Sequence, residues 1–143
     1  MQQLNEDEKL IIYADGACRG NQFTENIGAY GIVLLYKGHM KTLKQAFKNT
    51  TNNKMEIIAV IEALKAIKNY DLYTEVYTDS QYVVCTLNDG WKRNKNIELW
   101  NELDELISRF KCIKFIKVKG HDGDTYNELA DSLCNQAMDE LSK

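Results

Sequence analysis

Hydrophobic runs separated by turn residues divide the first third of the chain into strand-like segments. The pattern predicts strands at residues 9–15, 27–38 and 39–48, with Lys37 and Gly38 forming a tight turn between the last two. A turn of two residues joins neighbouring strands that run in opposite directions. We therefore expect the first three strands to form an antiparallel meander.

The hydrophobic period becomes helical from residue 55 onward. Apolar residues spaced three and four apart between Met55 and Ile67 predict an amphipathic helix of about four turns. The rest of the chain alternates between the two patterns, with strands predicted at 73–78 and 111–120 and helices at 80–87, 97–110 and 124–141. Strands separated by helices pair in parallel through right-handed crossovers. The sequence therefore predicts an α/β fold: a five-stranded mixed sheet, antiparallel in its first three strands and then parallel, flanked by helices.

Length and composition are those of one ordered domain. The chain has 143 residues, of which 44% are hydrophobic and 27% charged, so we expect a single domain over residues 1–143. No apolar run approaches the roughly 20 residues of a membrane helix, and the N-terminus is polar and acidic. We expect a cytoplasmic protein with no membrane contact. Its cysteines are scattered without a C-x-x-C motif, which favours reduced thiols over disulfides or zinc: Cys18, Cys85, Cys112 and Cys134.

The charge of the chain is unevenly distributed. The formal net charge is −3, but lysines recur between residues 37 and 54, and Lys92, Arg93 and Lys95 form a second basic group. A solvated face is the ordinary explanation of any one such run. Because a total charge hides local patches, the value of −3 leaves nucleic-acid binding open.

Carboxylates stand at the ends of several predicted elements. Asp15 ends the first predicted strand and Asp79 follows the fourth, so parallel pairing would bring both to the edge where α/β sheets bind ligands. Glu56 begins the long helix, and Asp131 lies in the first half of the last one. Each has a plainer explanation: a turn at Asp15 and Gly16, a capping box of Asn53 with Glu56, an N-cap at Asp79 or Ser80, and solvation of Asp131. Their convergence at one edge favours a functional site.

Four segments carry these residues in order: YADGACRGN, TTNNKMEIIAVIEAL, YTDSQYVV and VKGHDGDTYNELADSLCNQA. In order and spacing they resemble the signature blocks of type 1 ribonuclease H, over about residues 9–138. The resemblance implies a ribonuclease H-like fold and an endonuclease that hydrolyses the RNA strand of RNA/DNA hybrids. It also implies a two-metal-ion mechanism that leaves 3′-hydroxyl and 5′-phosphate ends, with two Mg²⁺ ions per site and Mn²⁺ as a substitute.

The same resemblance implies roles for individual residues. The implied catalytic metal ligands are Asp15, Glu56, Asp79 and Asp131, and Asp15 is expected to be the carboxylate that bridges both ions. His121 is an assisting catalytic residue that moves protons or helps the product to leave, and not a metal ligand. His39 lies at the predicted hairpin turn, and we expect no catalytic role for it.

The residues that bind the substrate are expected to recognise the chemical difference between RNA and DNA. The 2′-hydroxyl both donates and accepts hydrogen bonds, and amide side chains can answer both needs. By the resemblance, the substrate-binding positions are Asn21, Thr51, Asn52, Asn53, Gln81 and Trp91, with Glu56 also near a ribose. Thr51 and Asn21 match positions that hold a phosphate of the DNA strand. Trp91 is expected to stack on a sugar of that strand, and its plainer explanation is a partly buried anchor.

Two departures from the family pattern affect these expectations. The segment CTLNDGWKRNKNIELW is too short to hold the helix and basic loop of many bacterial members, so this is a form without the basic protrusion and its hybrid affinity should be weaker. No proline follows Asn21, so we expect a more mobile loop there.

The expected partner is an RNA/DNA hybrid, bound by a monomer. Two alternatives stay open: a nuclease-like fold that only binds nucleic acid, and a DNA-cutting integrase, resolvase or exonuclease of the wider superfamily. The first would ordinarily have lost a carboxylate, and the second would not be expected to keep TTNN and DSQ together.

Overall fold

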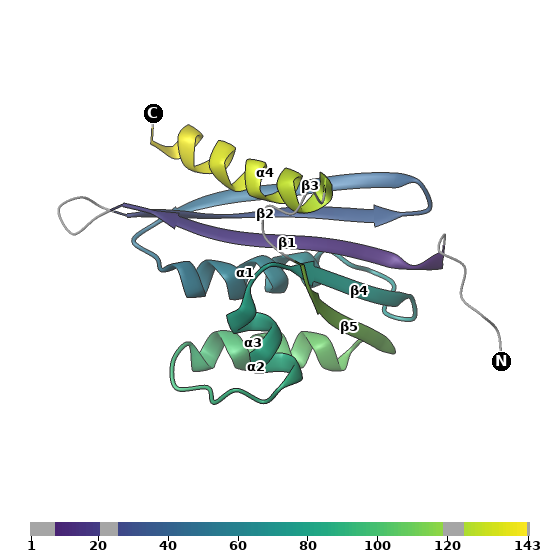
Figure 1. Cartoon of the computed structure of the whole chain (residues 1–143). Coiled ribbons are helices and arrows are strands. Elements are labelled where there is room, and N and C mark those ends of the chain that lie inside the picture. Colours follow the sequence, from purple (N-terminus) through teal and green to yellow (C-terminus); the bar gives the residue numbers. More distant parts are fainter. Residues whose placement is uncertain (1–7, 21–25, 119–124, 143) are drawn as a thin grey trace.

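A computed structural model describes residues 8–20, 26–118 and 125–142 of the chain. Its centre is a five-stranded sheet in the order β3-β2-β1-β4-β5 (Figure 1). The strands are β1 (Leu10–Arg19), β2 (Ile27–Tyr36), β3 (His39–Lys48), β4 (Tyr73–Thr78) and β5 (Cys112–Lys117). The pairs β1–β2 and β2–β3 are antiparallel, whereas β1–β4 and β4–β5 are parallel. The predicted mixed sheet is confirmed.

Helices cover both faces of this sheet. They are α1 (Asn52–Lys65), α2 (Gln81–Asn88), α3 (Ile97–Ser108) and α4 (Thr125–Leu141). In Figure 1, α4 lies above the sheet, and α1, α2 and α3 lie below it. Within the described ranges, no helix is both long enough and apolar enough to cross a membrane.

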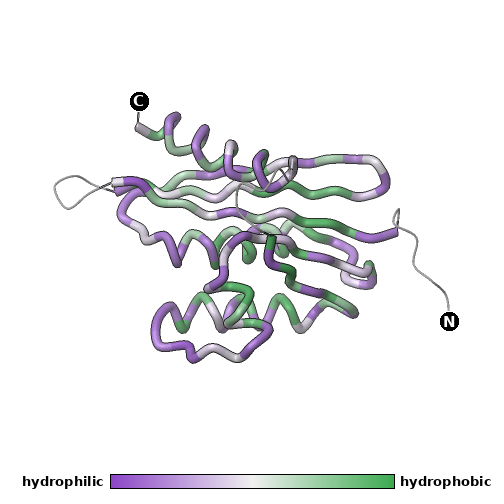
Figure 2. Tube along the Cα trace, in the orientation of Figure 1, coloured by the Kyte–Doolittle hydropathy of each residue, from purple (hydrophilic) through white to green (hydrophobic). Residues whose placement is uncertain are grey.

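Alternating residues of β1 supply the cores on the two faces. Ile12 points into the larger core, which includes Ile57 of α1 and Trp100 of α3. Tyr13 points to the opposite face and packs with Val33 and residues of α4. Figure 2 shows the corresponding concentration of hydrophobic residues along β1 and β2. Because successive strand residues alternate between faces, Asp15 shares the α4 side with Tyr13.

The structure corrects the predicted end of the first strand. Pairing with β4 stops at Tyr13, opposite Tyr77, but pairing with β2 continues as far as Arg19. Asp15 therefore lies inside β1, and the explanation of Asp15 and Gly16 as a turn is wrong. The segment DGACR lacks the hydrophobic alternation of a strand, and its extended form depends on pairing with β2, which local sequence does not reveal.

The start of α1 also differs from the capping box that the sequence suggested. The hydroxyl of Thr51 accepts a hydrogen bond from the backbone N–H of Lys54 at 3.1 Å, so Thr51, and not Asn53, is the N-cap. At α2 the N-cap is Ser80, one of the two predicted candidates, which accepts from the N–H of Val83 at 3.1 Å.

Candidate active site

Two carboxylates meet where β4 ends beside β1. Tyr13 pairs with Tyr77 at the end of the β1–β4 ladder, and Asp15 and Asp79 each follow two residues later in the sequence. The proximity has an electrostatic consequence, because the charge of Asp79 is among the causes that raise the pKa of Asp15. The expected meeting of these two carboxylates at one edge of the sheet is therefore present.

Gly16 allows α1 to add a third carboxylate. A Cβ atom at this position would lie 2.5 Å from the backbone nitrogen of Glu56 and would clash with the carbonyl group of Met55. Only glycine therefore lets the first turns of α1 rest directly on β1. This close approach brings Glu56 to the same edge as Asp15, whose pKa its charge also raises.

The fourth carboxylate comes from α4, on the other face. Gly31 of β2 pairs with Asp15, and a Cβ at Gly31 would lie 2.9 Å from the Cβ of Leu133 and clash with the carbonyl of Ala130. The helix thus packs against bare backbone at this point. Asp131 follows Ala130, and its proximity is a further cause that raises the pKa of Asp15. Two close helix–strand contacts therefore place carboxylates around one residue.

The surroundings of Asp15 strongly disfavour its charged form. It is only 6% exposed, and its pKa is raised from 3.8 to about 8, first by burial and then by Asp79 and Asp131, with a smaller effect of Glu56. The thiol of Cys134 donates to the backbone carbonyl of Asp15 at 3.2 Å and lies 3.9 Å from Oδ2 of its carboxylate. A weak donor of this kind compensates little of the charge.

Glu56 is held more firmly. Its Oε2 accepts a hydrogen bond from the Ser80 hydroxyl at 2.5 Å, and its Oε1 accepts from the Asn52 amide at 2.9 Å. Burial raises the pKa of Glu56, and these two hydrogen bonds oppose that rise. Ser80 caps α2 with the same hydroxyl, so a single residue links the start of that helix to the candidate site.

The donor set fits a hard divalent cation. Carboxylate oxygens are the ligands that Mg²⁺ prefers, and four of them converge here from separate elements. Among the described residues, no three His, Cys, Asp or Glu side chains form a ready-made metal site. The carboxylates are thus close enough to repel one another but are not closed around an ion. A bound cation would remove that repulsion and draw them together.

Four of the six expected substrate residues lie at the starts of α1 and α2. Thr51, Asn52 and Asn53 are exposed at the start of α1, where they line a hollow of about 420 Å³ together with Lys95 and Asn96. Gln81 is exposed in the first turn of α2, two residues after Asp79. The predicted substrate residue Asn21 and the predicted catalytic residue His121 lie outside the described ranges.

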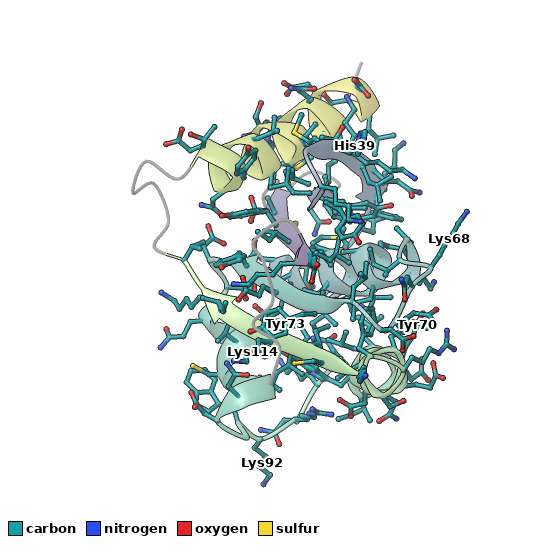
Figure 3. The ribbon with its side chains drawn as sticks, turned by 90° about the vertical axis from the view of Figure 1, so that its right-hand side faces the viewer. His39, Lys68, Tyr70, Tyr73, Lys92 and Lys114 are labelled. Atoms are coloured by element: carbon teal, nitrogen blue, oxygen red, sulfur yellow. The ribbon has the colours of Figure 1, made fainter. Side chains whose placement is uncertain are left out.

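The residues of the short basic loop between α2 and α3 differ in whether they contact the rest of the protein. Trp91 is 47% exposed, and Lys92 extends away from the body of the molecule (Figure 3). Arg93 instead forms a two-bond ion pair with Asp104, and its guanidinium lies 5.2 Å from the ring centre of Trp100. Arg93 is therefore engaged in holding the loop against α3, and Lys92 is the better candidate for a phosphate contact.

Sequence reasoning missed three residues that shape the site. The sequence predicts a turn at Gly16, a helix cap at Ser80 and a reduced thiol at Cys134, but no role in the site for any of them. A partial signal existed for two of them. Cys134 lies three residues after Asp131 and hence on the same helix face, and Ser80 directly follows Asp79. The need for glycine at residue 16 depends on a contact between distant elements and has no local signal.

The order of strands, the covering helices and the edge of carboxylates define a ribonuclease H-like fold. A family model described as RNase H matches residues 7–139. A ribonuclease H of Clostridium botulinum is 50% identical over 94% of this chain and 99% of that protein. A ribonuclease H of Caldicellulosiruptor saccharolyticus is 41% identical over 94% and 99% of the two chains.

Solved structures of ribonucleases H are also similar to this chain. RNase H1 of the halophilic archaeon Halobacterium salinarum superimposes with a TM-score of 0.75 at 31% identity, covering 92% of this chain and 98% of that one. LC11-RNase H1, isolated from compost and crystallised with an RNA/DNA hybrid, has a TM-score of 0.79 at 26% identity over 94% and 99% of the chains. The chain belongs to the ribonuclease H family of enzymes.

Proposed function

We propose that this chain is an endonuclease that hydrolyses the RNA strand of RNA/DNA hybrids and leaves 3′-hydroxyl and 5′-phosphate ends. The observation that carries the proposal is the cluster of carboxylates around Asp15. Membership of the family supports it, as does the hybrid bound to the similar LC11 enzyme. The proposed metal ligands are Asp15, Glu56, Asp79 and Asp131, with two Mg²⁺ ions as the expected cofactor and Mn²⁺ as a substitute.

Two bound ions would supply an activated water and would neutralise the charge that develops on the leaving 3′-oxygen. The contribution of the protein is to hold oxygen ligands in place. Ser80 and Asn52 fix both oxygens of Glu56, and the sheet fixes the backbone of Asp15. His121 is proposed to assist by moving a proton or helping product release.

Recognition of the hybrid is proposed to use the exposed polar side chains around this cluster. The amides of Asn52, Asn53 and Gln81 are suited to the 2′-hydroxyl and base edges of the RNA strand. Thr51 and Asn21 are proposed to hold a phosphate of the DNA strand, and Trp91 to stack on one of its sugars. The hydroxyl of Thr51 already caps α1, and it can accept that bond while donating to a phosphate.

The remaining expectations stay predictions. They are a single domain over residues 1–143, a monomeric state and a cytoplasmic location. The binding-only alternative is disfavoured because none of the four carboxylates is replaced. A DNA-cutting activity is disfavoured because the polar TTNN segment lies at the start of α1 beside Glu56.

A panel of labelled duplexes tests the proposal. RNA/DNA, RNA/RNA and DNA/DNA duplexes of one sequence are incubated with the protein in Mg²⁺, in Mn²⁺ and in EDTA, with Asp15→Asn as the control for contaminating nuclease. We expect cleavage of the RNA strand in the hybrid alone, loss in EDTA, and products that a 3′-end-dependent polymerase can extend. Cleavage of DNA/DNA, or equal cleavage of all three, would overturn the assignment.

A further inference from the structure

Helix α4 covers only part of the sheet face on which it lies. It begins at Thr125, and β1, β2 and β3 continue beyond that point with no helix of the described ranges over them (Figure 1). Three residues there form one cross-strand row, with Ile11 opposite Leu35 and Leu35 opposite Met40. Cross-strand partners point to the same face. Ile11 and Leu35 pack against the cluster on the α4 side, so the row lies on that face.

This row forms part of a hollow of about 350 Å³, which we name the Met40 hollow. Tyr126, from the first turn of α4, lines it as well, as does the β2–β3 turn at Lys37 and Gly38. Met40 is 56% exposed and Tyr126 is 38% exposed, and both are among the large hydrophobic residues that the fold leaves open. Clustered exposed apolar residues with a polar surround are typical of interaction surfaces.

The rim of the Met40 hollow is basic. Lys9, Lys37 and His39 line it, and no Asp or Glu is among its lining residues within the described ranges. The carboxylate nearest in the same row is Glu75, which pairs with Ile11 across β1 and β4. Glu75 accepts a hydrogen bond from the Tyr77 hydroxyl at 3.0 Å and lies 3.9 Å from the Lys9 ammonium, so the charges of Glu75 and Lys9 offset each other and Lys37 is the main cation of the rim.

Positive charge continues from the rim along the open end of the sheet. The ammonium groups of Lys9 and Lys114 each lie 5.6 Å from the ring centre of Tyr73. Figure 3, which views this end, shows Lys114 and Tyr73 close together on β5 and β4, with His39 at the side nearer α4. Lysine side chains thus lie on both sides of Glu75 at this end of the sheet, next to the apolar hollow.

We propose that the Met40 hollow binds a peptide segment of a partner protein, in which a bulky apolar side chain is flanked by carboxylates. The apolar side chain would contact Ile11, Leu35 and Met40, and the unbranched thioether of Met40 can adapt to its shape. The carboxylates would meet the basic rim. An apolar anchor inside a charged rim is the usual arrangement of a small protein–protein interface.

A single-stranded nucleic acid is the competing occupant, and the floor of the hollow disfavours it. Bases bind sequence-independently by stacking on exposed aromatic rings. The row Ile11–Leu35–Met40 has no aromatic ring, and both tyrosines that line the hollow are engaged. Tyr126 packs on Tyr13 with ring centres 5.6 Å apart, and Tyr36 packs against the larger core with the Lys37 ammonium 5.4 Å from its ring centre. None of the proposed metal ligands lines the hollow, so this proposal is independent of the hydrolytic activity.

Fluorescence anisotropy with three labelled probes tests the proposal on the full chain. The first probe is the peptide Asp-Glu-Phe-Leu-Glu-Asp, the second replaces Phe-Leu by Ser-Ser, and the third is an oligothymidine. The test variants are Met40→Glu and Lys37→Glu. Lys41→Glu is the matched control, because it makes the same charge change in the same hairpin but is not a lining residue. Thermal melts confirm that all variants fold, and hybrid cleavage should be unchanged in each.

We expect saturable binding of the first peptide alone, weakened at least about 10-fold by Met40→Glu and by Lys37→Glu and less than about 2-fold by Lys41→Glu. Equal weakening by Lys37→Glu and Lys41→Glu would show a diffuse charge effect and would overturn the proposal. It would also be overturned if the oligothymidine, and not the peptide, lost binding in Met40→Glu, since the surface would then be one for nucleic acid.

Discussion

Asp15 is buried and Glu56 is half-buried at the same edge of the sheet, yet the two carboxylates differ in the hydrogen bonds that they accept. Glu56 receives hydrogen bonds from Ser80 and Asn52, one to each oxygen. Asp15 has the weak thiol donor of Cys134 and three carboxylates as neighbours. Burial raises the pKa of both residues, but only for Glu56 do hydrogen bonds offset the rise.

This difference suits the two carboxylates to different roles in the site. Glu56 is oriented by the protein itself, so its position should not depend on a bound ion. Asp15 is held by its backbone in β1, and its charge has no strong partner among the described residues. A cation bound as proposed would stabilise the ionised form of Asp15, and metal binding would then be coupled to folding stability through this residue.

The largest expected effect comes from Asp15→Asn. Loss of one preorganised electrostatic group costs about 10²–10³-fold in rate, and we expect the upper end or beyond for Asp15, the one fully buried carboxylate of the cluster. Cleavage of a labelled hybrid in Mg²⁺ measures this loss. Unchanged hydrolysis would remove Asp15 from the site.

The same variant has a pH-dependent effect on stability without metal. In the folded protein the pKa of Asp15 is about 8, whereas the ordinary value is 3.8. Between these values the folded state keeps a proton that the unfolded chain has lost, so stability falls as pH rises from about 4 to about 8. Thermal melts in EDTA should show Asp15→Asn equal to the native chain near pH 4 and more stable at pH 8. A constant difference across this range would contradict the raised pKa.

Gly16→Ala should have the next largest effect, because it separates the two carboxylates. The new Cβ would collide with the start of α1, and overpacking of this kind costs about 1–3 kcal/mol. We expect the displaced Glu56 to lower kcat more than 10-fold. Urea unfolding and steady-state kinetics measure the two effects. Gly90→Ala is the control: its positive φ of 69° also strains the backbone, but a Cβ there meets open space, so activity should persist.

Ser80→Ala tests the hydrogen bonds of Glu56 and should act more mildly. It removes one donor to Glu56 and also the N-cap of α2, which is worth about 1 kcal/mol. Ser80→Gly loses the same donor, but glycine at an N-cap costs only a few tenths of a kcal/mol. Both variants should therefore require more Mg²⁺ for half-maximal activity, while only Ser80→Ala is clearly less stable. Full activity at the native Mg²⁺ requirement in both would show that Asn52 suffices to orient Glu56.

The smallest effect is expected in the loop before α3, away from both carboxylates. Lys92→Ala should raise KM for the hybrid and reduce the slope of log affinity against log salt by about 0.9, the value for one phosphate contact. Arg93→Ala should change that slope little, because its guanidinium pairs with Asp104, and should cost up to about 1 kcal/mol of stability. KM at several salt concentrations distinguishes the two. Equal slopes for both variants would mean that Arg93 leaves Asp104 to bind the substrate.

The sequence predicts the order and type of every described strand and helix, because each has a clear hydrophobic period. It does not predict where β1 ends, since residues 15–19 become a strand only by pairing with β2. It identifies Asp15 and Asp79 as neighbours through the topology of parallel strands. It does not reveal that Gly16 is needed for the approach of α1, or that Ser80 bonds to Glu56, because both depend on contacts between segments distant in the chain.

The contact of Cys134 and Asp131 with Asp15 joins the beginning of the chain to its last helix. A contact of such high contact order forms only after the intervening loop has closed, which is slow relative to local helix formation. The antiparallel meander of β1, β2 and β3 can assemble from the first third of the chain, but it contains only one of the four carboxylates. Hydrolysis by a growing or refolding chain should therefore begin only when α4 docks on the sheet. In a refolding experiment, the time at which cleavage begins would then measure when the native structure is complete.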